Sequence, residues 1–503
     1  MRAATAAILA TLVLAGSSGC GGGSEPRGDA RKGGSITIGA SSLPRVLDPS
    51  LATDPRALQA LRAVYTPPLS YRHAEGREGT ELIPGLAREL PEVSDDGLVY
   101  SFRFRAGLRY SDGTRLRASD FERAVDRARR LGSPYAGLYA GITAIEADDR
   151  SGRVAVTLSQ PDEAFRYALA LPASAPVPTG TRSADLSSHL PPAIGPYRVA
   201  RVRPGERLVL QRARGFDLPD LPSGNVDEVT IERFGSPAAQ SEAVATGATL
   251  DVMQELPPTS ELPEIRSKYE DRYEEQAIAS SLFLAIDPAS PPFDDRTLRQ
   301  AVSLAVDGPT LERLYAGRLQ PSCNLLPSPV AGYARLDPCP YGERGDPPDL
   351  VRAQELVEDA GQEGTVVTVG MDPGAAPPAV LRYFTATLRK VGLAARAEPA
   401  ASRPAIALEL IAPPVAHPSA FLAQFRGRTD DLELDADIGR LLVEPDRDED
   451  DWAGIDERLV EDAYVAPLGS QKLPTFFSER IDVQGCAVFH PVFGTDFAGL
   501  CLR

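Results

Sequence analysis

The stretch SDDGLVYSFRFRAGLRYSDGTRLRASDFERAV, residues 94–125, holds several turn signals and two periodic patterns. Apolar and polar residues alternate from Leu98 to Phe104, which predicts a half-buried strand with its aromatic residues in a core. A turn at residues 111–114 comes next, and Ser119 and Glu122 then have the spacing of a capping box at a helix start. The stretch therefore predicts a strand, a turn, a second strand, a second turn and a helix.

The length, composition and net charge restrict which classes of protein this chain can belong to. A chain of 503 residues is too long for one hydrophobic core, so two or three domains or lobes are expected. Its apolar content of 43% and charged content of 24% are those of an ordinary globular protein. A formal charge of −17 argues against a nucleic-acid partner, because phosphates require clustered Lys and Arg.

The N-terminus has the pattern of an exported protein. A short positive start and an apolar run within residues 1–19 predict a signal peptide, and that run is too short to span a bilayer comfortably. Residues 14–20 resemble a bacterial lipobox, whose cysteine is acylated, so Cys20 is the expected lipidation site. Ser17 departs from that pattern, which prefers leucine there. The alternative is a secreted protein with an unmodified cysteine. Residues 20–32 then form a flexible tether.

The remaining cysteines are Cys323, Cys339, Cys486 and Cys501. An even number in an exported chain favours two disulfides, with three possible pairings. Pairs of nearest neighbours would each close a loop of about fifteen residues, worth roughly 3 kcal/mol. Zinc binding is disfavoured because the sequence has neither CxxC spacing nor paired histidines.

Several motifs of catalysis and metal binding are missing from the sequence. The histidines His73, His189, His417 and His490 are scattered singly, and no HExxH, GxxxxGK[ST] or mature GxSxG motif occurs. The acidic run at residues 446–451 has carboxylates at some calcium-loop positions, but Asp451 stands where that loop needs glycine. We expect a solvated loop there, leading into a helix start at Asp456. No enzyme activity, cofactor or metal is therefore expected.

The rest of the chain alternates strands with helices. A buried strand is predicted at residues 282–286, followed by a helix capped by Asp294 or Asp295, and a later helix at residues 352–360 precedes a strand at residues 366–369. This alternation predicts an α/β lobe.

Several segments in order together resemble the family 5 extracellular solute-binding proteins of ABC transporters, the peptide and nickel class. The resemblance covers residues 33–503. It rests on these segments: 82–87, 93–98, 110–114, 118–121, 195–197 with 204–206, Gly247 with Asp251, 292–295 with 299–301, 353–361 and 490–494.

The resemblance implies an α/β, two-lobed periplasmic-binding-protein-like fold (type II, cluster C) with a small subdomain inserted in the first lobe. The expected division places residues 33–60, 190–275 and 475–503 in lobe I, 61–189 in the inserted subdomain and 276–474 in lobe II.

The implied function is that of the extracytoplasmic solute-binding component of an ABC importer. It would capture a short peptide or similar small solute between closing lobes and deliver it to the permease subunits. A monomer is expected, lipid-anchored at the outer face of the cytoplasmic membrane or in the periplasmic space. The alternative is a degenerate binding protein that acts as a sensor or surface interaction module for a non-peptide ligand.

The expected ligand contacts lie on loops that would face the cleft. These are Leu43, Pro44, Arg45, Tyr65, His417 and Phe421. In peptide-binding relatives a loop acid pairs with the peptide ammonium, whereas the comparable run here, residues 412–421, carries His417 and no acid. A free peptide amino terminus would then lack its expected partner.

Overall fold

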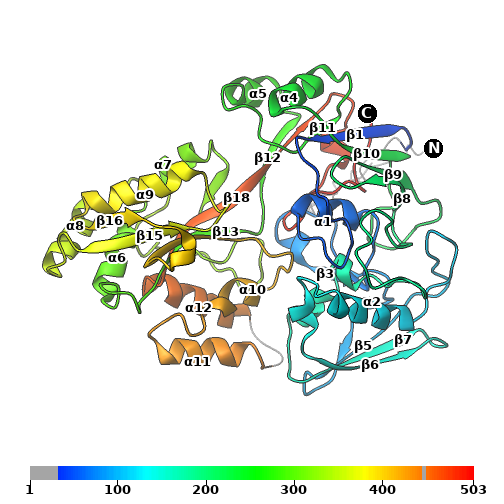
Figure 1. The fold of residues 1–503 in the computed structure, drawn as a ribbon, viewed down its shortest axis with the longest axis horizontal. Coiled ribbons are helices and arrows are strands. Elements are labelled where there is room, and N and C mark those ends of the chain that lie inside the picture. Colours follow the sequence, from blue (N-terminus) through cyan, green and yellow to red (C-terminus); the bar gives the residue numbers. More distant parts are fainter. Residues whose placement is uncertain (1–31, 445–448) are drawn as a thin grey trace, which may run out of the picture.

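The computed structural model describes residues 32–444 and 449–503, which form two α/β lobes side by side (Figure 1). Cys20, the signal peptide and most of the tether lie outside the described residues. A mixed 12-stranded sheet runs through both lobes, in the order β16-β15-β17-β13-β18-β11-β1-β10-β9-β8, with β12 and β14 also pairing with β18. The predicted two-lobed α/β fold is therefore confirmed.

Lobe I is built on the parallel pairing of β1 with β10 and β11, because the apolar residues of these strands face a common core. Its elements are β1 (Ser35–Ala40), α1 (Pro55–Arg62), β8 (Tyr197–Arg203), β9 (Arg207–Arg212), β10 (Glu228–Arg233), α4 (Pro237–Thr246), β11 (Val252–Met253), α5 (Leu262–Lys268), β12 (Tyr273–Ala277), α13 (Val483–Cys486), β19 (Phe489–His490) and β20 (Gly494–Thr495).

The inserted subdomain lies below lobe I in Figure 1 and has its own four-stranded sheet, β4-β5-β7-β6. Its elements are β2 (Leu69–Tyr71), η1 (Gly76–Thr80), β3 (Leu82–Pro84), β4 (Glu92–Val93), β5 (Val99–Arg103), α2 (Ser119–Arg130), η2 (Ala136–Tyr139), β6 (Ile142–Asp148), β7 (Arg153–Leu158), α3 (Phe165–Ala168) and η3 (Pro172–Ser174). The alternation predicted for β5 is confirmed, since Tyr100 and Phe102 are buried.

Lobe II packs its helices around a separate core. Its elements are β13 (Ser281–Ile286), α6 (Arg296–Leu304), α7 (Gly308–Leu314), β14 (Leu319–Pro321), α8 (Leu350–Asp359), β15 (Val366–Met371), α9 (Pro378–Lys390), β16 (Ala394–Ala397), η4 (Ala400–Ser402), β17 (Ile406–Ile411), α10 (Ser419–Leu422), η5 (Ala423–Phe425), α11 (Leu432–Leu441), α12 (Glu449–Glu461) and β18 (Val465–Phe477).

Strand β18 belongs to both lobes. Its first half pairs with β13 and β14, and its second half pairs with β12 and β11. Where β14 meets β18, a Cβ on Gly469 would lie 2.1 Å from the carbonyl oxygen of Gln320, and the φ of Gly469 is +141°, so glycine is required. The predicted boundary at residues 474–475 falls inside β18, while the other predicted boundaries stay predictions.

Two local predictions are wrong. Ser119 is not the cap of α2: it lies inside the first turn, and its N–H and hydroxyl donate to Asp149 from the β6–β7 turn at 2.9 and 3.1 Å. The segment after β5 forms no second strand: it makes two isolated bridges, Phe104 with Ala87 and Arg109 with Arg115, and β5 itself pairs with β4 and β7. In both cases distant residues replace the local partner.

The acidic run near residue 450 was also misassigned. Helix α12 already begins at Glu449, so Asp456 lies within the helix and is buried rather than at a solvated start. Its carboxylate accepts the Leu325 N–H at 2.8 Å and the Asn324 amide at 2.8 Å, which ties α12 to the loop after β14. Asp446 and Asp448 lie outside the described residues.

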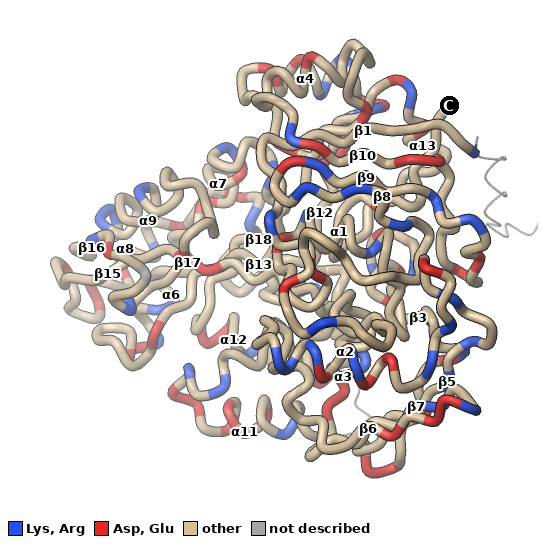
Figure 2. The backbone as a smooth tube through the Cα atoms, turned by 45° about the vertical axis from the view of Figure 1, so that its right-hand side comes forward, with Lys and Arg blue, Asp and Glu red and all other residues tan. Residues whose placement is uncertain are grey.

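The structure joins Cys323 to Cys339 and Cys486 to Cys501, with Cα atoms 5.9 and 6.0 Å apart. This is one of the three pairings that the sequence left open. Acidic and basic residues are interspersed over both lobes (Figure 2), as the diffuse negative charge suggested. Within the described residues, no helix is long and apolar enough to cross a membrane.

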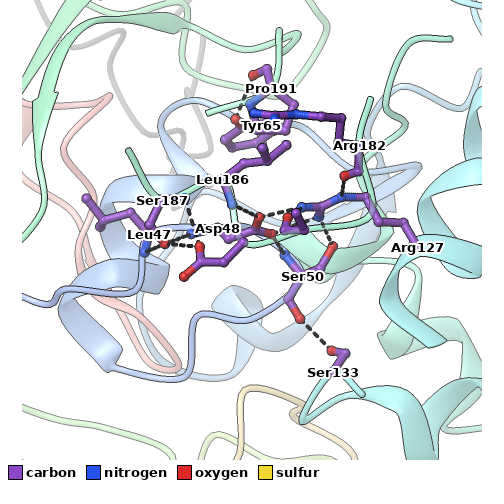
Figure 3. A network of polar contacts seen from close by, with 12 residues as sticks. Leu47, Asp48, Ser50, Tyr65, Arg127, Ser133, Arg182, Leu186, Ser187 and Pro191 are labelled. Carbon is purple, nitrogen blue, oxygen red and sulfur yellow. Dashed lines mark hydrogen bonds and ion pairs between the residues drawn. The ribbon is translucent and has the colours of Figure 1, made fainter. Parts of the chain in front are cut away.

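A buried ion pair holds the inserted subdomain on lobe I (Figure 3). Arg127 on α2 donates to both oxygens of Asp48 at 2.8 and 2.5 Å, and both side chains are almost fully buried. The remaining guanidinium N–H groups donate to Ser50 Oγ and to the carbonyls of Arg182 and Ala184. The carboxylate also accepts backbone N–H groups, including that of Leu186 at 2.8 Å. A buried pair so fully hydrogen-bonded fixes three segments in one arrangement.

We predict that Arg127→Met lowers the free energy of unfolding by about 3–5 kcal/mol, because Asp48 keeps its burial and loses its counterion. Arg130→Met on the same helix is the control, since the Arg130–Asp126 pair is exposed and its loss should cost about 0.5 kcal/mol or less. Denaturant unfolding measures both, and equal losses would contradict the role assigned to the buried pair.

Candidate functional site

The loop after β17, residues 412–417, reaches from lobe II to the inserted subdomain, and we call it the docking loop. Its Val415 and Ala416 are buried in the same apolar core as Leu69 and Tyr71 of the subdomain. The Ala416 N–H donates to Tyr71 Oη at 3.1 Å, and this hydroxyl donates to the Pro414 carbonyl at 3.4 Å. Burial raises the pKa of Tyr71, so its hydroxyl stays protonated and can donate.

His417 ends the docking loop and lies between aromatic rings from two parts of the molecule. Its ring centroid is 5.4 Å from that of Tyr167 in the inserted subdomain and 5.9 Å from that of Trp452 on α12. Nδ1 lies 2.7 Å from the Ser419 hydroxyl, and the residue is buried. The residue singled out in the sequence is therefore at a contact between lobe II and the subdomain.

A charged cluster lies beside this contact. Asp496 lies 2.8 Å from Nδ1 of His73 and 3.9 Å from the Arg62 guanidinium. The Arg62 guanidinium carbon is 4.3 Å from the centroid of Phe493, a cation–π distance. Phe493 and His490 both pack edge-on against Tyr71, at 5.7 and 5.5 Å. The charged cluster is thus continuous with the ring that receives the docking loop.

Burial and neighbouring charge set the protonation of this cluster. Burial opposes ionisation of Asp496, but His73 and Arg62 outweigh it and hold the pKa of this carboxyl well below its usual range. Burial, with the field of Arg62, lowers the pKa of His490 well below its ordinary value. Nδ1 of His490 accepts the N–H of Val492 at 3.1 Å. The cluster therefore holds a neutral His490 next to an ionised, paired Asp496.

The other predicted contacts lie elsewhere in this conformation. Leu43 and Pro44 line a small cavity of lobe I beside the β8–β9 turn, and Arg45 packs against Gly205 of that turn. Tyr65 borders a crevice with Arg62 and Asp496, but its side chain is buried and donates to the Pro191 carbonyl at 2.7 Å.

Phe421 is enclosed in the core of lobe II with Leu422 and Phe425. No surface of Phe421 is exposed in this conformation, where it packs in the core, and its contact with a ligand stays a prediction.

Sequence reasoning missed Arg62, Tyr71 and Asp496 as members of a site. They are far apart in the chain, and nothing in their local pattern distinguishes them from ordinary helix, strand and loop residues. A signal did exist for His490 and Phe493, which belong to the segment 490–494 that carried part of the family resemblance.

We predict that the contribution of His490 to stability depends on pH. Its folded pKa lies below the unfolded value of 6.5, so the unfolded chain binds the proton and the free energy of unfolding falls as pH decreases below about 6.5. The free-energy difference between wild type and His490→Gln should fall by about 1.4 kcal/mol per pH unit from about pH 6 to 5.

Denaturant unfolding across this range measures the difference. His189→Gln is the control, since the exposed His189 ring is hydrated in the folded and the unfolded chain alike. If the difference in the free energy of unfolding between wild type and His490→Gln did not change with pH, burial of the neutral His490 ring would not contribute to the pH dependence of stability.

Comparison with known proteins identifies related chains. The model of the bacterial extracellular solute-binding proteins, family 5, middle region, matches residues 81–448. The glutathione-binding protein GsiB of Escherichia coli O1:K1 / APEC is 29% identical over 279 residues, covering 54% of this chain and 51% of that protein. GsiB of Shigella flexneri matches over the same length with the same identity. The match thus spans about half the length of these curated relatives.

Solved structures share the whole fold. The clavulanic acid biosynthesis oligopeptide binding protein 2 has a TM-score of 0.80 at 22% identity, covering 94% of this chain and 96% of that one. DppA from Helicobacter pylori in complex with the peptide STSA has a TM-score of 0.70 at 20% identity, covering 94% and 98%. NikA from Brucella suis in complex with Fe(III)-EDTA has a TM-score of 0.77 at 20% identity, covering 93% and 100%.

Because these sequence identities are low, the solved structures establish the fold alone. The family model, however, covers well over half of the sequence. The chain therefore belongs to the bacterial extracellular solute-binding proteins of family 5.

Proposed function

We propose that this protein is the extracytoplasmic solute-binding component of an ABC importer, which captures a short peptide or similar small solute between its lobes and passes it to permease subunits. The observation that carries the proposal is the contact between the docking loop of lobe II and Tyr71 of the inserted subdomain, in a molecule whose two lobes share strand β18. Family membership supports it, and so do the names of relatives that bind glutathione or a peptide.

The physical basis is a population shift. A ligand that touches both lobes binds the closed form more tightly and so favours closure, whereas a ligand with equal affinity for both forms shifts nothing. The docking loop and Tyr71 provide the closing contact, and His417 and Tyr167 are our proposed ligand neighbours. Leu43, Pro44 and Arg45 remain proposed contacts on the lobe I side.

The proposal includes the place of the protein in the cell. Export would use residues 1–19, and an acylated Cys20 would hold a monomer at the outer face of the cytoplasmic membrane, near its permease, where the effective concentration is high. Metabolic labelling with radioactive palmitate tests the anchor.

We predict that at least one member of a panel of glutathione and tri- to pentapeptides stabilises the protein. A ligand at a hundredfold excess over its Kd adds about 2.7 kcal/mol. For a chain of this length that raises Tm by about 3 °C in differential scanning fluorimetry. If no compound raised Tm, the transport proposal would fail.

We also predict that N-acetylation of the ligand changes its affinity by less than about threefold, because the docking loop carries no acid to pair with an ammonium group. A large loss of affinity on acetylation would reveal an acid partner elsewhere and contradict this interpretation of the docking loop.

His417→Ala should weaken ligand binding by about tenfold or more, since the His417 ring joins the two sides of the contact. His189→Ala is the control, because His189 is exposed.

A further inference from the structure

A cavity of about 260 Å³ lies in lobe II, between the loop after β14, the segment 343–345 and β18. None of its lining residues belongs to the docking loop or to the charged cluster around Asp496. The Cys323–Cys339 disulfide ties the loop that forms one wall to the chain that leads to Arg344. The cavity is thus a separate, covalently braced feature of the lobe.

Arg344 lines this cavity although it is only 4% exposed. Its Nε donates to the Pro467 carbonyl at 3.0 Å and one terminal nitrogen donates to the Ser303 carbonyl at 3.3 Å. Among the described residues no carboxylate forms an ion pair with it, and burial lowers its pKa to about 10. A guanidinium has five N–H donors, so several remain without a protein acceptor.

Such an arrangement is costly unless something compensates for it. A buried charge is normally paired, and an unpaired one loses hydration without an equivalent gain. Arg127 shows what pairing looks like in this protein, since every one of its N–H groups has an acceptor and its charge meets Asp48. Arg344 has the burial of Arg127 without the counterion.

The walls offer further free donors. Ser328, Tyr333 and Ser470 also line the cavity, and their hydroxyl groups make no hydrogen bond within the described part of the chain. The acid that also lines it, Glu343, is exposed; it pairs with Arg335 at 3.6 Å, and its charge also favours the ionised form of Arg344. The net charge presented by the buried wall is therefore that of Arg344.

We propose that this cavity is an anion site that takes the carboxylate of a solute about the size of an amino acid, with Arg344 as its counterion. A carboxylate accepts the planar fork of a guanidinium in two parallel hydrogen bonds. The volume is well above the roughly 30 Å³ of one water, which leaves room for a small organic body beside the charged group. The carboxylate can come from a free acid or from the last residue of a peptide. This second site goes beyond the interlobe binding proposed above.

The test compares N-acetylalanine with N-acetylalaninamide, which has nearly the same shape and no charge. In isothermal titration calorimetry on the whole protein, we expect the acid to bind at least about tenfold more tightly than the amide. Arg344→Met should remove this preference, and so should Ser470→Asp, which places a fixed negative charge in the cavity. Arg352→Met is the control, because Arg352 is exposed on α8 and pairs with Glu355. Comparing the binding of alanylalanine with that of its C-terminal amide then shows whether the site takes the carboxylate of a peptide terminus as well as that of a free acid.

Ser470→Asp leaves the two hydrogen bonds of Arg344 in place, so it decides the question if Arg344→Met does not fold. Equal binding of acid and amide to the wild type would overturn the proposal. Absence of acid binding up to millimolar concentration, or acid binding of wild-type strength in Ser470→Asp, would do the same. Because the probe is a single residue, the result is independent of whether a peptide binds between the lobes.

Discussion

Strand β18 pairs with partners in both lobes, and this pairing limits how the lobes can be placed relative to each other. Its backbone groups bond to β13 and β14 at one end and to β12 and β11 at the other. Both ends are buried, whereas Leu473 in between is 38% exposed. Under the proposed function, each lobe would keep its own core while the two turn about the exposed middle of this strand, next to the short link between β12 and β13.

That constraint gives the docking loop its importance. Two bodies joined by strands need a contact that defines their relative arrangement, and in this conformation Tyr71 contributes one by bonding the Pro414 carbonyl and the Ala416 N–H. The Asp48–Arg127 pair makes the inserted subdomain move with lobe I, so a contact to the subdomain is a contact to the whole lobe. Under the proposed function, ligand recognition would depend on aromatic rings and neutral groups around His417, since the carboxylate of the charged cluster, Asp496, is already paired.

Periodicity and the family resemblance predicted the fold because alternation in β5 and the cap at Asp295 are local properties of the chain. Prediction failed where a distant residue took the place of a local one: Asp149 replaced the expected cap of α2, and Asn324 and Leu325 drew Asp456 into the core. The candidate site was predicted least well. His417 could be singled out because it departs from a family motif. Arg62, Tyr71 and Asp496 become neighbours only through folding. Arg344 is distinguished only by the absence of an acidic partner, which the sequence does not show.

The proposed function requires the lobes to move about β18 and close on a ligand. Double electron–electron resonance measures this movement between spin labels on Leu432→Cys in α11 and Thr143→Cys in β6, both exposed, in a Cys20→Ser background. We expect a longer distance component in the free protein that disappears when a stabilising ligand saturates it. An identical distance distribution with and without a ligand that raises Tm would contradict it.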